Sequence, residues 1–311
     1  MFRLIALAIL AFILYALIFF KIDYKSTLIA LGRVDLTSWL LILGLSFGNY
    51  FLRYFRWSRT IAIMSVEVPF KIHFPIYLAG FAMTVTPGKA GEWLRAVFLK
   101  PFGVGYGVST WVFLYEHVLD LFVITIFASL ILVNFPTYIP WVAILVLGMF
   151  LAVVFLRTKH IRQLIIDFVE GAGWKRALAA LQKIDLQLLK AEPIFSMKSL
   201  AFGAGLGVTA WGLEVIGLTL VLGIMDFSQP LINVAGIYGA AMLFGALSFV
   251  PGGVGTAEAV MIIGLTALGC DMSTAVAATL ICRASTLWFA VVTGAVSLVV
   301  LSVMGYRTKK I

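Results

Sequence analysis

Long apolar runs, bounded by charged residues or by Pro and Gly, constrain the fold of this chain more than any other feature. An α-helix needs about 20 apolar residues to cross ~30 Å of hydrocarbon. Apolar residues make up 62% of the chain and charged residues 12%, which excludes a water-soluble domain. We therefore predict an all-α integral membrane protein with six transmembrane spans, at 4–20, 37–55, 107–132, 141–156, 199–222 and 273–303.

Two further apolar segments, 74–100 and 231–268, are interrupted by Pro87-Gly88 and by Pro251-Gly252. Proline removes a backbone donor and glycine permits a sharp turn, so each segment is predicted to be two half-helices that meet at a turn. We interpret both as re-entrant helical hairpins. The alternative is that Pro-Gly only kinks ordinary spans.

The distribution of Lys and Arg supports this topology through the positive-inside rule. With a cytoplasmic N-terminus and two re-entrant hairpins, 17 basic residues, Arg53 and Arg56 among them, fall on the cytoplasmic side and 3 on the other. Full crossing by either hairpin would move every later loop to the other side and abolish the bias. We expect both termini in the cytoplasm, at the plasma membrane of a prokaryote.

The loop 157–198 is the one long polar connection, and its charged and apolar residues alternate at helical spacing. It is predicted to form amphipathic helices on the cytoplasmic leaflet, where Lys and Arg meet anionic head groups. A solvated connector is the alternative.

The two Pro-Gly turns are related by an internal repeat. Thr84 to Glu92 resembles Ser248 to Thr256 at an offset of 164 residues, and matching spans flank both turns. The predicted topology inverts one half relative to the other, which is a recurrent transporter architecture. We expect a first membrane repeat at 1–135 and a second at 136–311.

A helix broken within lipid leaves backbone groups unpaired, which is tolerated only where protein or a water-filled cavity receives them. Free N–H groups at the start of a second half-helix favour an anion. The glycines that would open such sites follow the two prolines: Gly88, Gly91, Gly252, Gly253 and Gly255.

Nine ionisable residues fall inside the predicted membrane segments: Lys89, Glu92, Arg95, Glu116, His117, Asp120, Glu214, Glu258 and Arg283. A charged residue costs at least ~2.5 kcal/mol at a helix centre, so they should share an interior. In one interpretation Lys89, Arg95 and Arg283 bind an anionic head group while the carboxylates relay protons or balance charge. In the other, the charges form structural ion pairs, and His117 is a hydrogen-bonded core residue.

The sequence gives less support to other classes of function. The basic residues adjoin apolar segments rather than a separate domain, so a nucleic-acid partner is not expected. Cys270 and Cys282 are predicted to be buried packing residues, and neither a cofactor nor a metal site is expected. The sequence contains no H-E-x-x-H, G-x-S-x-G or Walker A motif, so an enzyme is disfavoured, although Glu and Asp could serve one without a known motif.

The motifs together resemble the lysylphosphatidylglycerol synthase transmembrane-region family of flippase-like membrane domains. The resemblance rests on Pro87-Gly-Lys-Ala-Gly-Glu-Trp-Leu-Arg95, the Glu116/Asp120 pair, Trp211-Gly-Leu-Glu214, Pro251-Gly-Gly-Val-Gly-Thr-Ala-Glu258, and Arg283 with Trp288. It implies translocation of a lipid between leaflets, with aminoacylated phosphatidylglycerol as the best-known cargo of fused members. Because we expect no synthase domain here, a separate lipid synthase or glycosyltransferase could be a partner.

The functional prediction is a lipid translocase whose partners are membrane lipids. Its cargo would be an anionic or aminoacylated phospholipid, or a polyprenyl-phosphate-linked lipid. Two alternatives remain: a membrane-embedded enzyme or accessory subunit that acts on a lipid-linked substrate, and a structural scaffold.

Overall fold

The computed structural model describes residues 24–85, 92–133 and 136–306, and these are helical with no strand. The first part of the chain forms α2 (Tyr24–Gly32), α3 (Leu36–Met64), α4 (Phe70–Ala79), α5 (Leu94–Leu99), α6 (Tyr106–Ser129) and α7 (Ile139–Arg157). The rest forms α8 (Lys159–Gly171), α9 (Lys175–Ala191), α10 (Met197–Ile224), α11 (Leu231–Leu247), α12 (Thr256–Ala267), α13 (Met272–Arg283) and α14 (Phe289–Val303). A π-helical turn, Ala284–Trp288, joins α13 to α14.

Among the described residues, three helices are long and apolar enough to cross a membrane: α6, α10 and the continuous stretch Met272–Val303. A fourth is added if α7 and α8, which are bent by 90°, count as one span. The described helices thus agree with a helical membrane protein, and three of the six predicted spans coincide with helices long and apolar enough to cross a membrane. The predicted span 4–20 lies outside the described residues.

Helix α3 corrects the prediction for its region. The span expected at 37–55 continues to Met64 over 29 residues, so that Arg53 and Arg56 lie within the helix and are buried, not in a cytoplasmic loop. Acidic side chains of α6 receive both guanidinium groups, which is why a helix with these charges can be buried. Removing the two from the 17 basic residues predicted to be cytoplasmic leaves 15, so the predicted bias against 3 on the other side remains.

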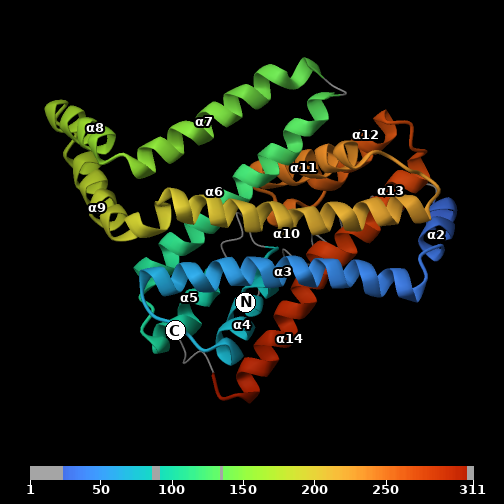
Figure 1. Ribbon diagram of the computed structural model, residues 1–311, viewed down its shortest axis with the longest axis horizontal. Coiled ribbons are helices and arrows are strands. Elements are labelled where there is room, and N and C mark those ends of the chain that lie inside the picture. Colours follow the sequence, from blue (N-terminus) through green and yellow to red (C-terminus); the bar gives the residue numbers. More distant parts are fainter. Residues whose placement is uncertain (1–23, 86–91, 134–135, 307–311) are drawn as a thin grey trace.

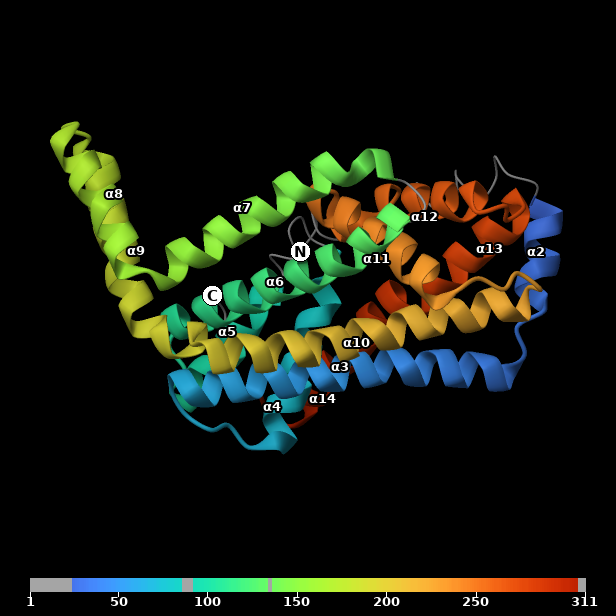
Figure 2. The ribbon, with the colours of Figure 1, turned by 45° about the horizontal axis from the view of Figure 1, so that its top comes forward.

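Helices α3 and α10 form the central pair, packed antiparallel along their length (Figure 1). Gly48 of α3 lies against Leu213, and Gly217 of α10 lies against Ile42, so small residues let the two helices approach. In both views α2, α12 and the start of α13 lie at one end of the bundle (Figures 1 and 2). The α8–α9 pair lies at the opposite end.

Each broken segment packs against the last long helix of the other half of the chain. In the first, α4 and the following turn Gly80–Met83 contact α14, while α11 of the second contacts α6. Both contacts depend on glycine. A Cβ on Gly294 of α14 would lie 2.1 Å from the backbone nitrogen of Ala82, and one on Gly239 of α11 would lie 2.3 Å from that of Ala128.

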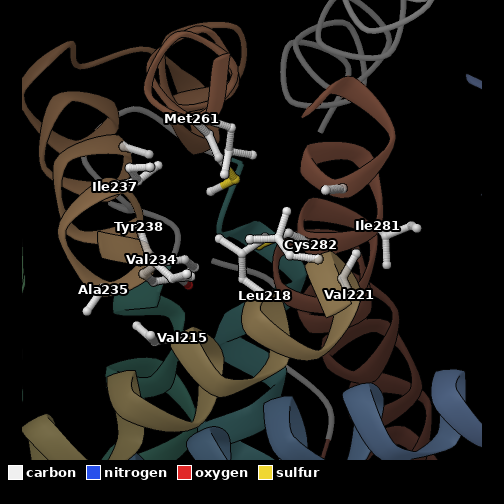
Figure 3. Close-up of a cluster of buried hydrophobic side chains, with 14 of the residues drawn as sticks. Val215, Leu218, Val221, Val234, Ala235, Ile237, Tyr238, Met261, Ile281 and Cys282 are labelled. Carbon is white, nitrogen blue, oxygen red and sulfur yellow. The ribbon is translucent and has the colours of Figure 1, made fainter. Parts of the chain in front are cut away.

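The largest hydrophobic core lies where α10, α11, α12 and α13 meet (Figure 3). Leu218 and Val221 of α10 belong to one buried cluster with Ile237 of α11, Met261 of α12 and Ile281 of α13. These helices are apolar around most of their circumference, as expected for helices buried within a membrane bundle. Both cysteines, Cys270 and Cys282, are free and buried.

The loop predicted at 157–198 forms α8 and α9, which pack on each other and project from one end of the bundle (Figure 2). Arg162 donates to Asp185 across the pair at 2.5 Å. Large apolar side chains remain exposed, including Phe168 at 71% and Trp174 at 62%. The predicted helical form is thus observed, and its contact with lipid stays a prediction.

Candidate functional site

The turn between α11 and α12 is held by a buried ion pair. Gly252, Gly253 and Gly255 all have positive φ, so the chain after Pro251 follows a path that side chains with a Cβ disfavour. Arg283 donates to the carbonyl of Gly252 at 2.6 Å and to Glu258 at 2.6 Å. Glu258 also accepts the amide of Gly255 at 2.6 Å, which caps α12. Arg283 and Glu258 therefore fix the turn.

The two broken segments share a contact at equivalent positions. Thr84 donates to Glu92 across the first turn at 3.4 Å, and Ser248 is hydrogen bonded to Thr256 across the second at 3.1 Å. Adding the repeat offset of 164 to 84 and 92 gives 248 and 256. The two segments thus share one side-chain hydrogen bond between positions related by the repeat offset.

The ends of the two broken segments meet inside the molecule. Val85 of the first and Val254 of the second belong to one small buried cluster with Leu287 of the π-helical turn. Tyr50 of α3 donates to the carbonyl of Thr286 in the same turn at 2.6 Å. π-Helical turns within α-helices occur frequently at functional sites.

A second group of buried charges lies between α3 and α6. Arg56 donates to Glu116 and to Asp120, each at 2.6 Å, and Arg53 donates to the other oxygen of Asp120. Trp211 of α10 also donates to Asp120, at 3.4 Å. Glu116 and Asp120 therefore lie on one face of α6, as predicted. The arginines that pair with them, Arg53 and Arg56, belong to α3.

Arg95 lies elsewhere. Its guanidinium carbon is 4.0 Å from the centre of the Tyr77 ring, and it donates to the carbonyl of Tyr77 at 2.9 Å and to Glu92 at 3.1 Å. These contacts join α4 to α5. Arg95 does not line the cavity described next, so the structure gives it a position suited to holding the first broken segment together.

A cavity of about 340 Å³ lies where the broken segments meet, and both halves of the chain line it. Arg53, Asp120, Glu214 and Arg283 provide its charges together with Glu92, while His117 adds an imidazole. The turn contributes Gly252 and Gly253. Leu247 and Phe249 line it as well and are 47% and 73% exposed, so the cavity reaches the surface beside them.

Glu214 has a different environment from the other buried carboxylates. It is 4% exposed and accepts the Ser46 hydroxyl of α3 at 3.0 Å. Among the ion pairs of the described residues, Glu92, Glu116, Asp120 and Glu258 each have an arginine, and Glu214 has none.

Four predicted site residues, Pro87, Gly88, Lys89 and Gly91, lie outside the described residues. Arg53 was missed, because the apolar run seemed to end near it. The signal that could have revealed it is helical spacing: Arg53 and Arg56 are three apart, as are residues on one helix face, and the apolar pattern resumes after them. In the part of the chain that the structure describes, no group of three His, Cys, Asp or Glu could hold a metal ion.

The fold and its buried charges define a polytopic helical membrane protein with an internal polar cavity. The chain belongs to the lysylphosphatidylglycerol synthase TM region family, whose model matches residues 3–294, so the resemblance found in the motifs is confirmed. It is also similar to a UPF0104 membrane protein of Methanothermobacter thermautotrophicus. The two are 25% identical over 288 residues, which cover 83% of this chain and 84% of that protein.

Proposed function

We propose that this protein is a lipid translocase, in which the cavity accepts an anionic lipid head group as it passes between leaflets. The observation that carries the proposal is the cavity itself, since two buried arginines, Arg53 and Arg283, line it at the meeting point of two broken segments. Buried ionisable residues within a membrane commonly mark a substrate pathway. A volume of about 340 Å³ suits a head group.

The proposed architecture has six spans, two re-entrant hairpins and two inverted repeats, 1–135 and 136–311. Three observations support it. The central α3 and α10 are antiparallel, each broken segment packs against the last helix of the other half, and equivalent hydrogen bonds cross the two turns. Inverted repeats with broken helices at their interface are the basis of alternating access. In this topology α8 and α9 lie on the cytoplasmic leaflet.

The rim of the cavity supports passage of a lipid rather than of a soluble anion. Leu247 and Phe249 line the cavity and are also exposed, and the neighbouring Phe244 is 57% exposed. An apolar, exposed rim lets acyl chains remain in the bilayer while the head group enters the polar interior. The cargo class is therefore an anionic or aminoacylated phospholipid or a polyprenyl-phosphate-linked lipid.

The same contacts leave the alternative, an enzyme that acts on a lipid-linked substrate, with few candidate groups. General acid–base catalysis needs a carboxyl group that can exchange a proton with the substrate. Asp120 and Glu92 line the cavity, but arginines hold both as ion pairs, so Glu214 is the lining carboxyl that could take this role.

A cavity-filling variant tests translocation without removing a charge. Ala246 of α11 is exposed and lines the cavity, so Ala246→Trp would obstruct it. Ile263→Trp is the matched control, because Ile263 of α12 is 65% exposed and does not line the cavity. The assay measures the movement of fluorescent phosphatidylglycerol, phosphatidylethanolamine and a polyprenyl phosphate between the leaflets of proteoliposomes.

Wild type and Ile263→Trp are expected to move at least one of these lipids faster than protein-free vesicles do. Ala246→Trp is expected to reduce that rate at least about tenfold, which corresponds to ~1.4 kcal/mol on the barrier. Equal rates in wild-type and protein-free vesicles for all three lipids would refute the proposal. Equal rates for the two Trp variants would place the pathway elsewhere.

A further inference from the structure

The positive and negative charges of the buried side chains described above are unequal in number. Arg53, Arg56, Arg95 and Arg283 face the five carboxylates of Glu92, Glu116, Asp120, Glu214 and Glu258, all of them less than 9% exposed. Every arginine is ion-paired with one of the other four carboxylates. Formally, the nine groups sum to −1 when Glu214 is ionised and to zero when it is protonated.

An ionised carboxylate at this position is costly. Burial of an ion costs several kcal/mol unless a partner and hydrogen bonds offset it, and among the described residues Glu214 accepts a hydrogen bond from Ser46 and has no cation within 4.0 Å. Asp120 accepts hydrogen bonds from Arg53, Arg56 and Trp211, which hold it ionised. Glu214 is therefore the buried carboxyl that can change its protonation state at least cost.

The hydrogen-bonding partner of Glu214 suits both states. The Ser46 hydroxyl, 3.0 Å from the carboxylate, can donate to it when ionised and can accept from it when protonated. An arginine partner could not make this exchange, since a guanidinium group only donates. The hydrogen bond between Ser46 and Glu214 can thus persist in both protonation states.

The remaining groups around Glu214 set the direction of coupling. Those that face it or share its cavity are Tyr50 and Arg53 of α3, Glu92 before α5, His117 and Asp120 of α6, Tyr238 of α11, and Cys282 and Arg283 of α13. A phosphate that enters near Arg53 and Arg283 adds negative charge beside Glu214, and so favours its protonated form. By reciprocity, a proton on Glu214 favours the phosphate.

We propose that Glu214 is a proton-binding site, and that a proton and an anionic head group occupy the cavity together. The inference rests on the proposed translocase function and specifies its coupling ion: the lipid anion moves with one proton, so that no net charge is added to the buried cluster. The proton comes from water and returns to water, and no covalent bond other than O–H changes.

The test is an equilibrium titration of purified protein in detergent with short-chain phosphatidylglycerol, whose phosphodiester stays ionised. It runs over about pH 5–9, the range in which a buried carboxyl without a cationic partner titrates. Wild-type affinity is expected to rise as the pH falls, approaching about tenfold per pH unit where one proton is taken up. Glu214→Gln, which imitates the protonated group, should bind at the low-pH affinity of the wild type with no pH dependence.

Two further variants keep the test decisive. Glu214→Asp retains a carboxyl, so it should retain a pH-dependent affinity. Loss of the dependence in Glu214→Gln alone then comes from the missing carboxyl and not from a perturbed fold. His117→Gln removes the imidazole that also lines the cavity, and should leave the pH dependence intact. A pH-independent wild-type affinity, a dependence retained by Glu214→Gln, or one lost in His117→Gln would overturn the proton site.

This outcome is separable from that of the proposed function, because binding is measured without translocation. Affinity that does not change with pH, together with active transport in vesicles, would reject the proton site alone. An affinity that rises as the pH falls, together with no transport of any lipid, would reject the proposed translocase function. Selective loss in Glu214→Gln of affinity for an ammonium-bearing lipid, with no change in pH dependence, would show that Glu214 binds a cationic head group instead.

Discussion

Gly294 of α14 offers a direct test of how the first broken segment is held. A Cβ at this position would lie 2.1 Å from the nitrogen of Ala82 and 2.7 Å from the carbonyl carbon of Phe81. Ordinary contacts begin at 3.4 Å, so the substitution Gly294→Ala requires a displacement of about 1.3 Å at the closer atom. The nearest atoms are all backbone, and no change of rotamer can relieve the contact.

Overpacking of this kind costs about 1–3 kcal/mol, and a backbone clash belongs at the upper end. We therefore expect Gly294→Ala to lose about 3 kcal/mol of stability, on the order of 100-fold in the equilibrium between docked and undocked states. Gly239→Ala should behave similarly, because its Cβ would lie 2.3 Å from the nitrogen of Ala128. The two variants perturb corresponding contacts of the two broken segments.

Gly212→Ala is the matched control. Gly212 lies within α10 with nothing within 4 Å of a new Cβ, and alanine favours the helix by about 1 kcal/mol over glycine. Thermal unfolding of the purified variants in one detergent, followed by tryptophan fluorescence, compares all three with the wild type. If Gly294→Ala and Gly239→Ala unfold at the same temperature as Gly212→Ala, the close packing of the broken segments is refuted.

Two other predictions concern the ends and the centre of the bundle. Arg56→Met leaves Glu116 without its arginine and should cost about 3–5 kcal/mol, whereas Arg59→Met, at an exposed position of the same helix, should cost less than about 1 kcal/mol in the same unfolding assay. Hydrogen bonds from Ser273 and from Thr274 lower the pKa of Asp271, the N-cap of α13, from 3.8 to about 2. Its stabilisation should therefore be complete above about pH 4 and disappear as the pH falls through 2, so that Asp271→Ala, about 1 kcal/mol less stable at neutral pH, approaches the wild type at low pH.

The helices follow from the sequence because their signals are local. Apolar runs of sufficient length predict α6 and α10 to within a few residues, and Pro251-Gly252 marks the turn between α11 and α12. The end of α3 does not follow in this way. Its arginines resemble the start of a polar loop in the sequence. Only the acidic residues of α6, which lie 60 or more positions later, allow these arginines to be buried inside a helix.

The ion-pair partners of the buried charges could not be predicted from the sequence either, because partners can lie far apart along the chain. Eight charged residues can be assigned to the membrane interior from position alone, yet Arg95 pairs with its neighbour Glu92 while Arg283 reaches Glu258 across a turn. These choices depend on how the helices pack. The pairing of Glu214 with Ser46 carries no sequence signal, since a serine within an apolar helix is ordinary.

The sequence predicts that Arg95 and Arg283 bind the proposed head group, whereas the contacts in the structure favour Arg53. Arg95 lies under aromatic rings, away from the cavity, and Arg283 is held by Glu258 and by the carbonyl of Gly252. Arg53 lines the cavity with a buried Nε that has no hydrogen-bond partner within the described structure. An unsatisfied buried donor costs about 1–3 kcal/mol, which an incoming phosphate oxygen would recover. Arg53, rather than Arg95, is therefore the side chain from which binding of the head group would begin.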